Sequence, residues 1–169
     1  MTPYQLARKR GDNVDIAINY AWRARDVERL PIEELAVFVL DWEGKPESTE
    51  VSISFVSDEE IAQLNQEYRQ KTGPTDVLSF ECDGYDDDFD EGMVMPEGMD
   101  VPFELGDVVI AVDVAESQAA VFGTSFQEEV ELLLTHGLLH LCGYDHIEDE
   151  DAQVMEALER RILAAWRNR

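Results

Sequence analysis

The chain has 169 residues, of which 44% are hydrophobic and 9% aromatic, so it has the size and composition of one globular domain and not of a disordered protein. Its 13 Lys and Arg against 38 Asp and Glu give a net charge of −25, which excludes a protein that coats nucleic acid through a basic surface. No stretch approaches the roughly 20 apolar residues of a membrane helix, and the first ten residues lack the apolar core of a signal peptide. We therefore expect a single domain over residues 1–169, cytoplasmic and without membrane contact.

Hydrophobic periodicity predicts two strands and two helices in the first half of the chain. Residues 13–20 and 50–57 alternate apolar and polar side chains, which is typical of half-buried strands. Residues 31–44 carry apolar side chains at helical spacing between Pro31 and Gly44, which suit the start and the end of a helix. A second helix is predicted from Ser57 to Tyr68, because Ser57 and Glu60 have the spacing of a capping box.

The second half is predicted to add two strands and three helices. Short apolar runs at 77–80 and 107–112 predict strands, and Asp113 is expected to cap a helix that ends at Phe122. A capping box at Ser125 begins a helix to Gly143 that is apolar nearly all round and therefore buried. A last helix over 149–166 has one apolar stripe, formed by Val154, Met155, Leu158, Ile162 and Trp166. About four strands and five helices predict a single α+β domain.

Acidic residues dominate the middle of the chain. Residues 72–159 contain no Lys or Arg, and ten acids fall between Glu81 and Glu104 together with three glycines and two prolines. Because like charges repel and Gly and Pro interrupt regular structure, we predict a flexible acidic loop insertion over 81–104. A loop that binds cations or docks a partner is the alternative.

All three histidines of the chain fall within eleven residues, at His136, His140 and His146. The first two are four apart on a predicted helix, so their imidazoles share one face and can bind one ion. Gly143 can adopt a positive φ after the last helical turn, which would return His146 to the same point. We predict a metal site of three histidines with one open position, and geometry favours zinc, although copper, nickel and iron also accept imidazole.

The spacing of these histidines equals that of the metzincin peptidases, H-E-x-x-H-x-x-G-x-x-H, with one difference. Those enzymes place their general base directly after the first histidine, where this chain has Gly137. Asp145 beside His146 is a candidate for orienting a ligand or accepting a proton. A solvated loop aspartate or a helix cap is the other interpretation.

Arg69 and Lys71 are the last basic residues before the anionic tract. An arginine that faces a metal centre can bind phosphate oxygens in a bidentate manner and stabilise the charge that grows in a transition state. By itself, an arginine near a helix end can equally be a surface residue that interacts with the helix dipole.

The segments 68–80 and 136–146, together with 105–110 and 115–119, resemble the YbeY family of bacterial endoribonucleases. The resemblance implies a four-stranded, mostly parallel mixed sheet packed by helices, with the metal-binding helix central. It implies one zinc ion per chain on His136, His140 and His146, and a required role for Arg69. The function it implies is a single-strand endoribonuclease in ribosomal RNA 3′-end maturation and ribosome quality control, with the small ribosomal subunit and ribosomal proteins or assembly factors as partners.

Two other functions remain open at this point. The histidine spacing also fits a zinc metallopeptidase or amidohydrolase, and a non-catalytic ribosome-assembly factor could hold a structural zinc. Because few cations lie near the predicted site, we expect free RNA to bind weakly and the chain to act on a ribosomal particle.

Overall fold

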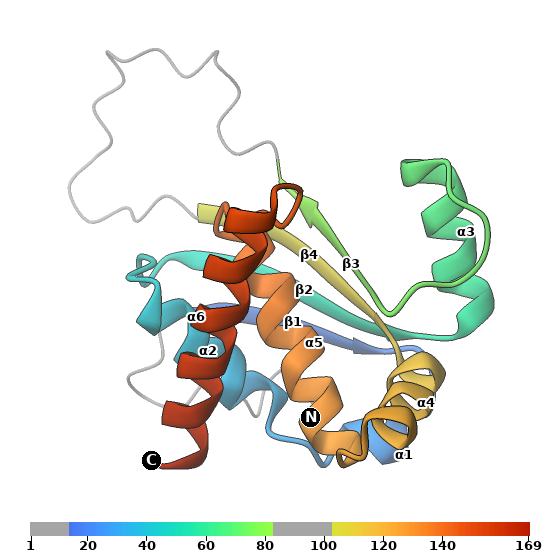
Figure 1. Ribbon diagram of the computed structural model, residues 1–169, viewed down its shortest axis with the longest axis horizontal. Coiled ribbons are helices and arrows are strands. Elements are labelled where there is room, and N and C mark those ends of the chain that lie inside the picture. The colour runs from blue at the N-terminus through green and yellow to red at the C-terminus, as the bar shows by residue number, and fades with distance from the viewer. Residues whose placement is uncertain (1–13, 83–102) are drawn as a thin grey trace.

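The computed structural model describes residues 14–82 and 103–169 (Figure 1). Within these ranges the chain forms four strands and six helices: β1 (Asp15–Tyr20), α1 (Ala24–Val27), α2 (Ile32–Trp42), β2 (Thr49–Val56), α3 (Asp58–Arg69), β3 (Val77–Glu81), β4 (Phe103–Ala111), α4 (Val112–Phe122), α5 (Phe126–Leu141) and α6 (Asp149–Arg167). Both predicted serine N-caps are confirmed, since the Ser57 hydroxyl accepts from the Glu60 amide at 3.3 Å and that of Ser125 from the Glu128 amide at 3.1 Å.

The four strands form one mixed sheet in the order β1-β2-β4-β3. β1 pairs with β2 and β2 with β4 in parallel, whereas β3 pairs with β4 in antiparallel register. The predicted α+β domain with a mostly parallel mixed sheet is confirmed. β3 is an edge strand of this sheet, and its antiparallel register is set by pairs such as Ser79 with Val108.

Helices cover the two faces of the sheet unequally (Figure 1). The main core lies between the sheet and α2, α5 and α6, and α5 packs directly on β3 and β4. A smaller cluster on the other face joins α3 to β3 and β4 through Ile61, Leu78 and Val109. Since successive residues of a strand point to opposite faces, Val108 and Ile110 enter the main core while Val109 enters the smaller one. The predicted central, buried position of the histidine helix is thus confirmed.

Three expectations about local structure are wrong. Asp113 does not cap α4, because β4 runs directly into that helix; its carboxylate instead accepts hydrogen bonds from Trp22 and Arg23 at 3.0 Å. Those contacts hold the additional short helix α1, which the periodicity did not predict. Val154 was placed on the apolar stripe of the last helix but is 59% exposed, whereas Met155 beside it is buried.

Both ends of the loop predicted over 81–104 belong to strands. Glu81 is the last residue of β3, and Phe103 and Glu104 belong to β4. Residues 83–102 of the predicted loop lie outside the described residues. Among the described residues, no helix has both the length and the apolar character needed to cross a membrane.

Candidate metal centre

Helix α5 supplies two of the three histidines from a rigid base. Its buried residues contact both the sheet and the neighbouring helices, so the helix has little freedom to rotate. His136 and His140 stand one turn apart on the same face, as their spacing predicts.

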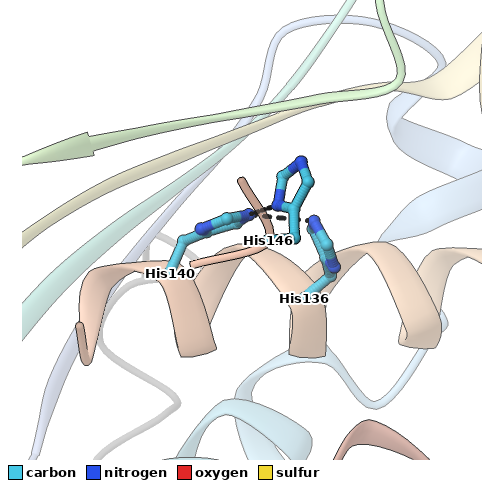
Figure 2. Close-up of side chains that lie close together, drawn as sticks. All are labelled: His136, His140 and His146. Carbon is cyan, nitrogen blue, oxygen red and sulfur yellow. Dashed lines mark hydrogen bonds between the residues drawn. The ribbon is translucent and has the colours of Figure 1, made fainter. Parts of the chain in front are cut away.

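The loop after α5 returns the third histidine to the same point. Gly143 adopts the predicted positive φ of 101°, which L side chains rarely adopt, and its amide donates to the His140 carbonyl at 3.0 Å. The Asp145 carboxylate then accepts from the amides of His146 and Ile147 at 2.6 and 3.1 Å. These turns place the His146 ring beside the helix (Figure 2).

The nitrogen atoms of the three rings converge (Figure 2). His136 Nε2 lies 3.0 Å from His140 Nε2, and His146 Nδ1 also lies 3.0 Å from His140 Nε2. The three candidate ligand atoms all lie within 4.8 Å of one another. Nitrogens bound to one tetrahedral zinc ion at 2.0–2.1 Å would be about 3.3 Å apart, so the two 3.0 Å spacings are close to those of a ligand set.

The remaining ring nitrogens of the two helical histidines are held by protein oxygens. His136 Nδ1 lies 2.5 Å from Glu159 Oε1, and His140 Nδ1 lies 2.9 Å from the Tyr144 carbonyl oxygen. A carbonyl can only accept, so Nδ1 of His140 carries the proton and the lone pair of Nε2 is free to bind a metal. The Glu159 carboxylate favours the same tautomer in His136.

Glu159 is a candidate positioning residue that the sequence pattern did not reveal. It lies on α6, and its side chain is 8% exposed against 28% for that of His136. A carboxylate buried beside a metal-binding imidazole fixes the ring orientation and makes the ligand more basic. The only sequence signal was an acid that falls among the buried positions of an amphipathic helix, next to Leu158.

The local environment keeps His140 neutral. Burial lowers the pKa of His140, and the neighbouring rings of His136 and His146 lower it further. A neutral imidazole is the form that binds metal ions.

The donor set fits a metal ion of borderline softness. Imidazole nitrogens whose lone pairs point at one another repel unless a cation lies between them, and imidazole is a preferred ligand of zinc. Within the described residues the group consists of these three side chains, with no fourth His, Cys, Asp or Glu. His146 is exposed, so an ion held here would keep one position open to solvent.

A cleft of about 750 Å³ lies beside this centre and has two walls. His140 and His146, with residues 143–147, form what we call the histidine wall; Tyr68, Arg69 and Lys71, at the end of α3, form the α3 wall. Ser79 and Phe80 of β3 also line the cleft. Arg69 therefore shares one cleft with two of the three metal-binding candidates, and among the described residues no carboxylate pairs with its guanidinium.

A second hollow of about 660 Å³ has the opposite character. It is lined by acids that include Asp15, Glu50 and Glu104, and it contains no basic side chain. A polyanion would be repelled there. The cleft beside the histidines is therefore the better candidate for phosphate chemistry.

The packing of Gly137 accounts for the missing peptidase base. A Cβ at this position would lie 2.6 Å from Cγ1 of Val108 and 3.3 Å from Oγ of Ser79, whose hydroxyl donates to the Gly137 carbonyl at 3.0 Å. The position faces β3 and β4, not the cleft, so a glutamate there would clash with the sheet. The histidine spacing that suggested a peptidase is unchanged, but this contact strengthens the argument against that hypothesis, because the peptidase base has no room at position 137.

Comparison with known proteins gives a consistent result. The family model described as "Endoribonuclease YbeY" matches residues 18–167. A protein of Geobacillus thermodenitrificans named "Endoribonuclease YbeY" is 41% identical over 154 residues, which cover 89% of this chain and 96% of the relative. A Bacillus subtilis protein of the same name is 38% identical over 135 residues, covering 80% and 83% of the two chains.

A solved structure supports the fold. The solution structure of a Thermotoga maritima protein matches with a TM-score of 0.54 and 26% sequence identity, and the match covers 90% of this chain and 92% of that one. The likeness extends over nearly the whole of both chains.

Proposed function

This chain belongs to the YbeY endoribonuclease family, and we propose that it cuts single-stranded ribosomal RNA at the maturing 3′ end of the small subunit and in ribosome quality control. The observation that carries the proposal is the convergence of three imidazole nitrogens next to a cleft that also contains Arg69. Such a substrate implies a cytoplasmic protein whose partners are the small subunit and its ribosomal proteins or assembly factors.

His136, His140 and His146 would hold one zinc ion per chain. A bound zinc ion supplies Lewis acidity toward a phosphoryl oxygen and lowers the pKa of a bound water. Glu159 and the Tyr144 carbonyl orient the two helical rings for this role.

Arg69 would bind the scissile phosphate. Its guanidinium has no carboxylate partner among the described residues and can donate two parallel hydrogen bonds to phosphate oxygens. Negative charge grows on these oxygens in the transition state. The permanently charged guanidinium of Arg69 beside them therefore lowers the barrier more than it strengthens ground-state binding.

Asp145 and the substrate itself are the candidates for managing protons. One oxygen of Asp145 accepts two backbone amides, and the residue lines the cleft. Because no glutamate follows His136, attack by the RNA 2′-hydroxyl is one route and attack by water is the other. Internal attack leaves a cyclic 2′,3′-phosphate, whereas water attack leaves a 5′-phosphate with a 3′-hydroxyl, or a 3′-phosphate with a 5′-hydroxyl.

The charge of the chain favours a substrate presented on a particle. With a net charge of −25, the protein gains little from counterion release on free RNA. Ribosomal proteins and magnesium on an immature subunit would offset this repulsion and position the strand.

The test is to incubate immature small subunits with zinc-loaded wild-type, Arg69→Ala and His140→Ala proteins and to map the RNA ends. The expected result is a discrete 3′ end with the wild type, with both variants defective. Lys71→Ala is the comparison for loss of charge alone, because Lys71 lines the same cleft as a point charge; it is expected to lose less activity than Arg69→Ala. If the wild type makes no cut, or His140→Ala cuts as well as the wild type, the proposal fails.

A further inference from the structure

Two large apolar side chains are exposed inside the cleft. Tyr68 is 58% exposed and Ile147 is 82% exposed, and both line it. The other exposed aromatic side chains of the described residues, Trp22, Trp42 and Phe122, lie outside it. An aromatic ring that remains in water next to a candidate catalytic centre has the character of a binding surface.

The ring of Tyr68 is supported from β3. Its centroid lies 5.2 Å from that of Phe80, with 64° between the ring planes, so the two rings meet edge to face. This contact restrains the ring, while more than half of the side chain stays accessible. Phe80 in turn packs against the cluster that joins α3 to the sheet, so the support is anchored in the fold.

Charge alone gives the cleft little affinity for RNA. Arg69 and Lys71 are its basic side chains, and Glu81 and Asp145 among the lining residues offset them. Two phosphate contacts on a single strand would give a slope of only about −1.4 for log K against log salt. Stacking of a base on an aromatic ring adds about 1–3 kcal/mol per base and needs no net charge.

We propose that Tyr68 is a specificity-determining residue whose ring stacks on the base next to the phosphate that Arg69 binds. The two residues are neighbours in the last turn of α3 and both line the cleft, so one segment would hold a phosphate and the adjoining base. A base inside a duplex is already stacked and paired, so this arrangement selects an unpaired nucleotide of any sequence. The inference rests on the proposed function, because it assumes an RNA strand in the cleft.

The test uses zinc-loaded full-length protein and a single-stranded oligoribonucleotide that carries the 3′-end sequence of the immature small-subunit RNA. 2-Aminopurine, a fluorescent base that is quenched when it stacks, is placed in turn at each position, and in parallel each base is removed to give an abasic nucleotide. The variants are Tyr68→Ala, Tyr68→Leu and Tyr68→Trp. Phe122→Ala is the matched control, because Phe122 is 66% exposed at the end of α4 and does not line the cleft.

We expect the wild type, Tyr68→Trp and Phe122→Ala to quench one 2-aminopurine position. Tyr68→Ala and Tyr68→Leu lose this quenching, and Tyr68→Ala loses roughly 5- to 150-fold in kcat/KM, mainly through KM. The abasic nucleotide at that position slows the wild type by a similar factor and does not slow Tyr68→Ala further, because the two changes remove the same contact.

The inference is overturned if Tyr68→Ala quenches and cleaves like the wild type, or if Tyr68→Leu restores both. It is also overturned if the abasic penalty is the same in the wild type and in Tyr68→Ala. Failure of the proposed function gives a different result: no RNA is cut by the wild type, while quenching at one position still depends on Tyr68.

Discussion

The histidine wall and the α3 wall of the cleft differ in how firmly their functional groups are held. Each helical histidine donates through its second nitrogen to a fixed oxygen, and the third is positioned by a turn that Gly143 and Asp145 form. On the α3 wall, Arg69 and Lys71 have no ion pair among the described residues, and Tyr68 is more than half exposed. A metal site needs fixed ligands, whereas groups that receive a flexible strand must stay accessible.

The largest expected effect is on the histidine wall. His140→Ala removes the ligand that lies between the other two, so we expect loss of the bound ion. Because metal assistance lowers the reaction barrier by several kcal/mol, we also expect kcat to fall roughly 1,000-fold or more. Metal content by mass spectrometry and cleavage rate are measured on the same sample. A variant that loses the ion but keeps its activity would contradict the assignment.

A substitution on the α3 wall should lower activity without removing the metal ion. Arg69→Ala is expected to lower kcat by about 100- to 1,000-fold, the usual cost of removing one donor from transition-state charge, while the metal content stays unchanged. Arg69→Lys recovers part of the activity, because an ammonium keeps the charge but not the bidentate geometry. Single-turnover kinetics with metal analysis separates the walls; a loss of metal in Arg69→Ala would show that they are not independent.

Glu159→Gln tests how much of the metal affinity comes from outside the ligand set. The amide keeps the shape but weakens the contact to His136 Nδ1, so we expect metal affinity to fall about 10- to 100-fold. Competition with a fluorescent chelator measures this change. Glu156→Gln, at an exposed position of the same helix, is the matched control and should bind metal like the wild type.

Gly137→Ala tests the packing beneath the histidine wall. The added Cβ would lie 2.6 Å from Val108, so either α5 or the strand must shift, at a cost of about 1–3 kcal/mol in the free energy of unfolding. Chemical denaturation measures the loss. Gly44→Ala is the control for a Cβ that meets no neighbour, because nothing lies within 4 Å of its Cβ position. Its positive φ adds backbone strain, so any loss of stability in this variant comes from strain and not from a clash.

The smallest effect is a pH dependence of the metal-free protein. Because the pKa of His140 is lowered by burial and by its neighbouring imidazoles, the unfolded chain takes up a proton that the folded chain resists. The stability from this group is therefore fully present above about pH 6.5 and is lost as the pH falls through the lower folded value. Thermal unfolding with a chelator should show Tm falling below about pH 6.5, with a flatter profile in His140→Asn.

Much of the fold followed from local patterns. Period-2 alternation predicts two of the four strands and short apolar runs the other two, while helical spacing predicts the five longer helices. The N-caps at Ser57 and Ser125 could be predicted since each bond joins residues only three positions apart. The role of Asp113 could not be predicted from local patterns, because its partners Trp22 and Arg23 lie some 90 residues away in the chain.

The residues of the candidate site also fall into those that local sequence predicts and those that depend on distant contacts. The three histidines and the positive φ of Gly143 could be predicted, because the ligands lie in one short segment whose geometry is local. Glu159 could not, since its contact to His136 depends on how α6 crosses α5. The role of Gly137 was also hidden, because the reason for it is the close approach of β4.

The central claim is that the three imidazoles bind one ion with a position left open toward the cleft. X-ray absorption spectroscopy of the zinc-loaded protein, with and without inorganic phosphate, tests it most directly. The account predicts one zinc ion per chain, three imidazole nitrogens at about 2.0–2.1 Å and an oxygen ligand that phosphate replaces. A fourth ligand from the protein, or fewer than three imidazoles around the ion, would contradict it.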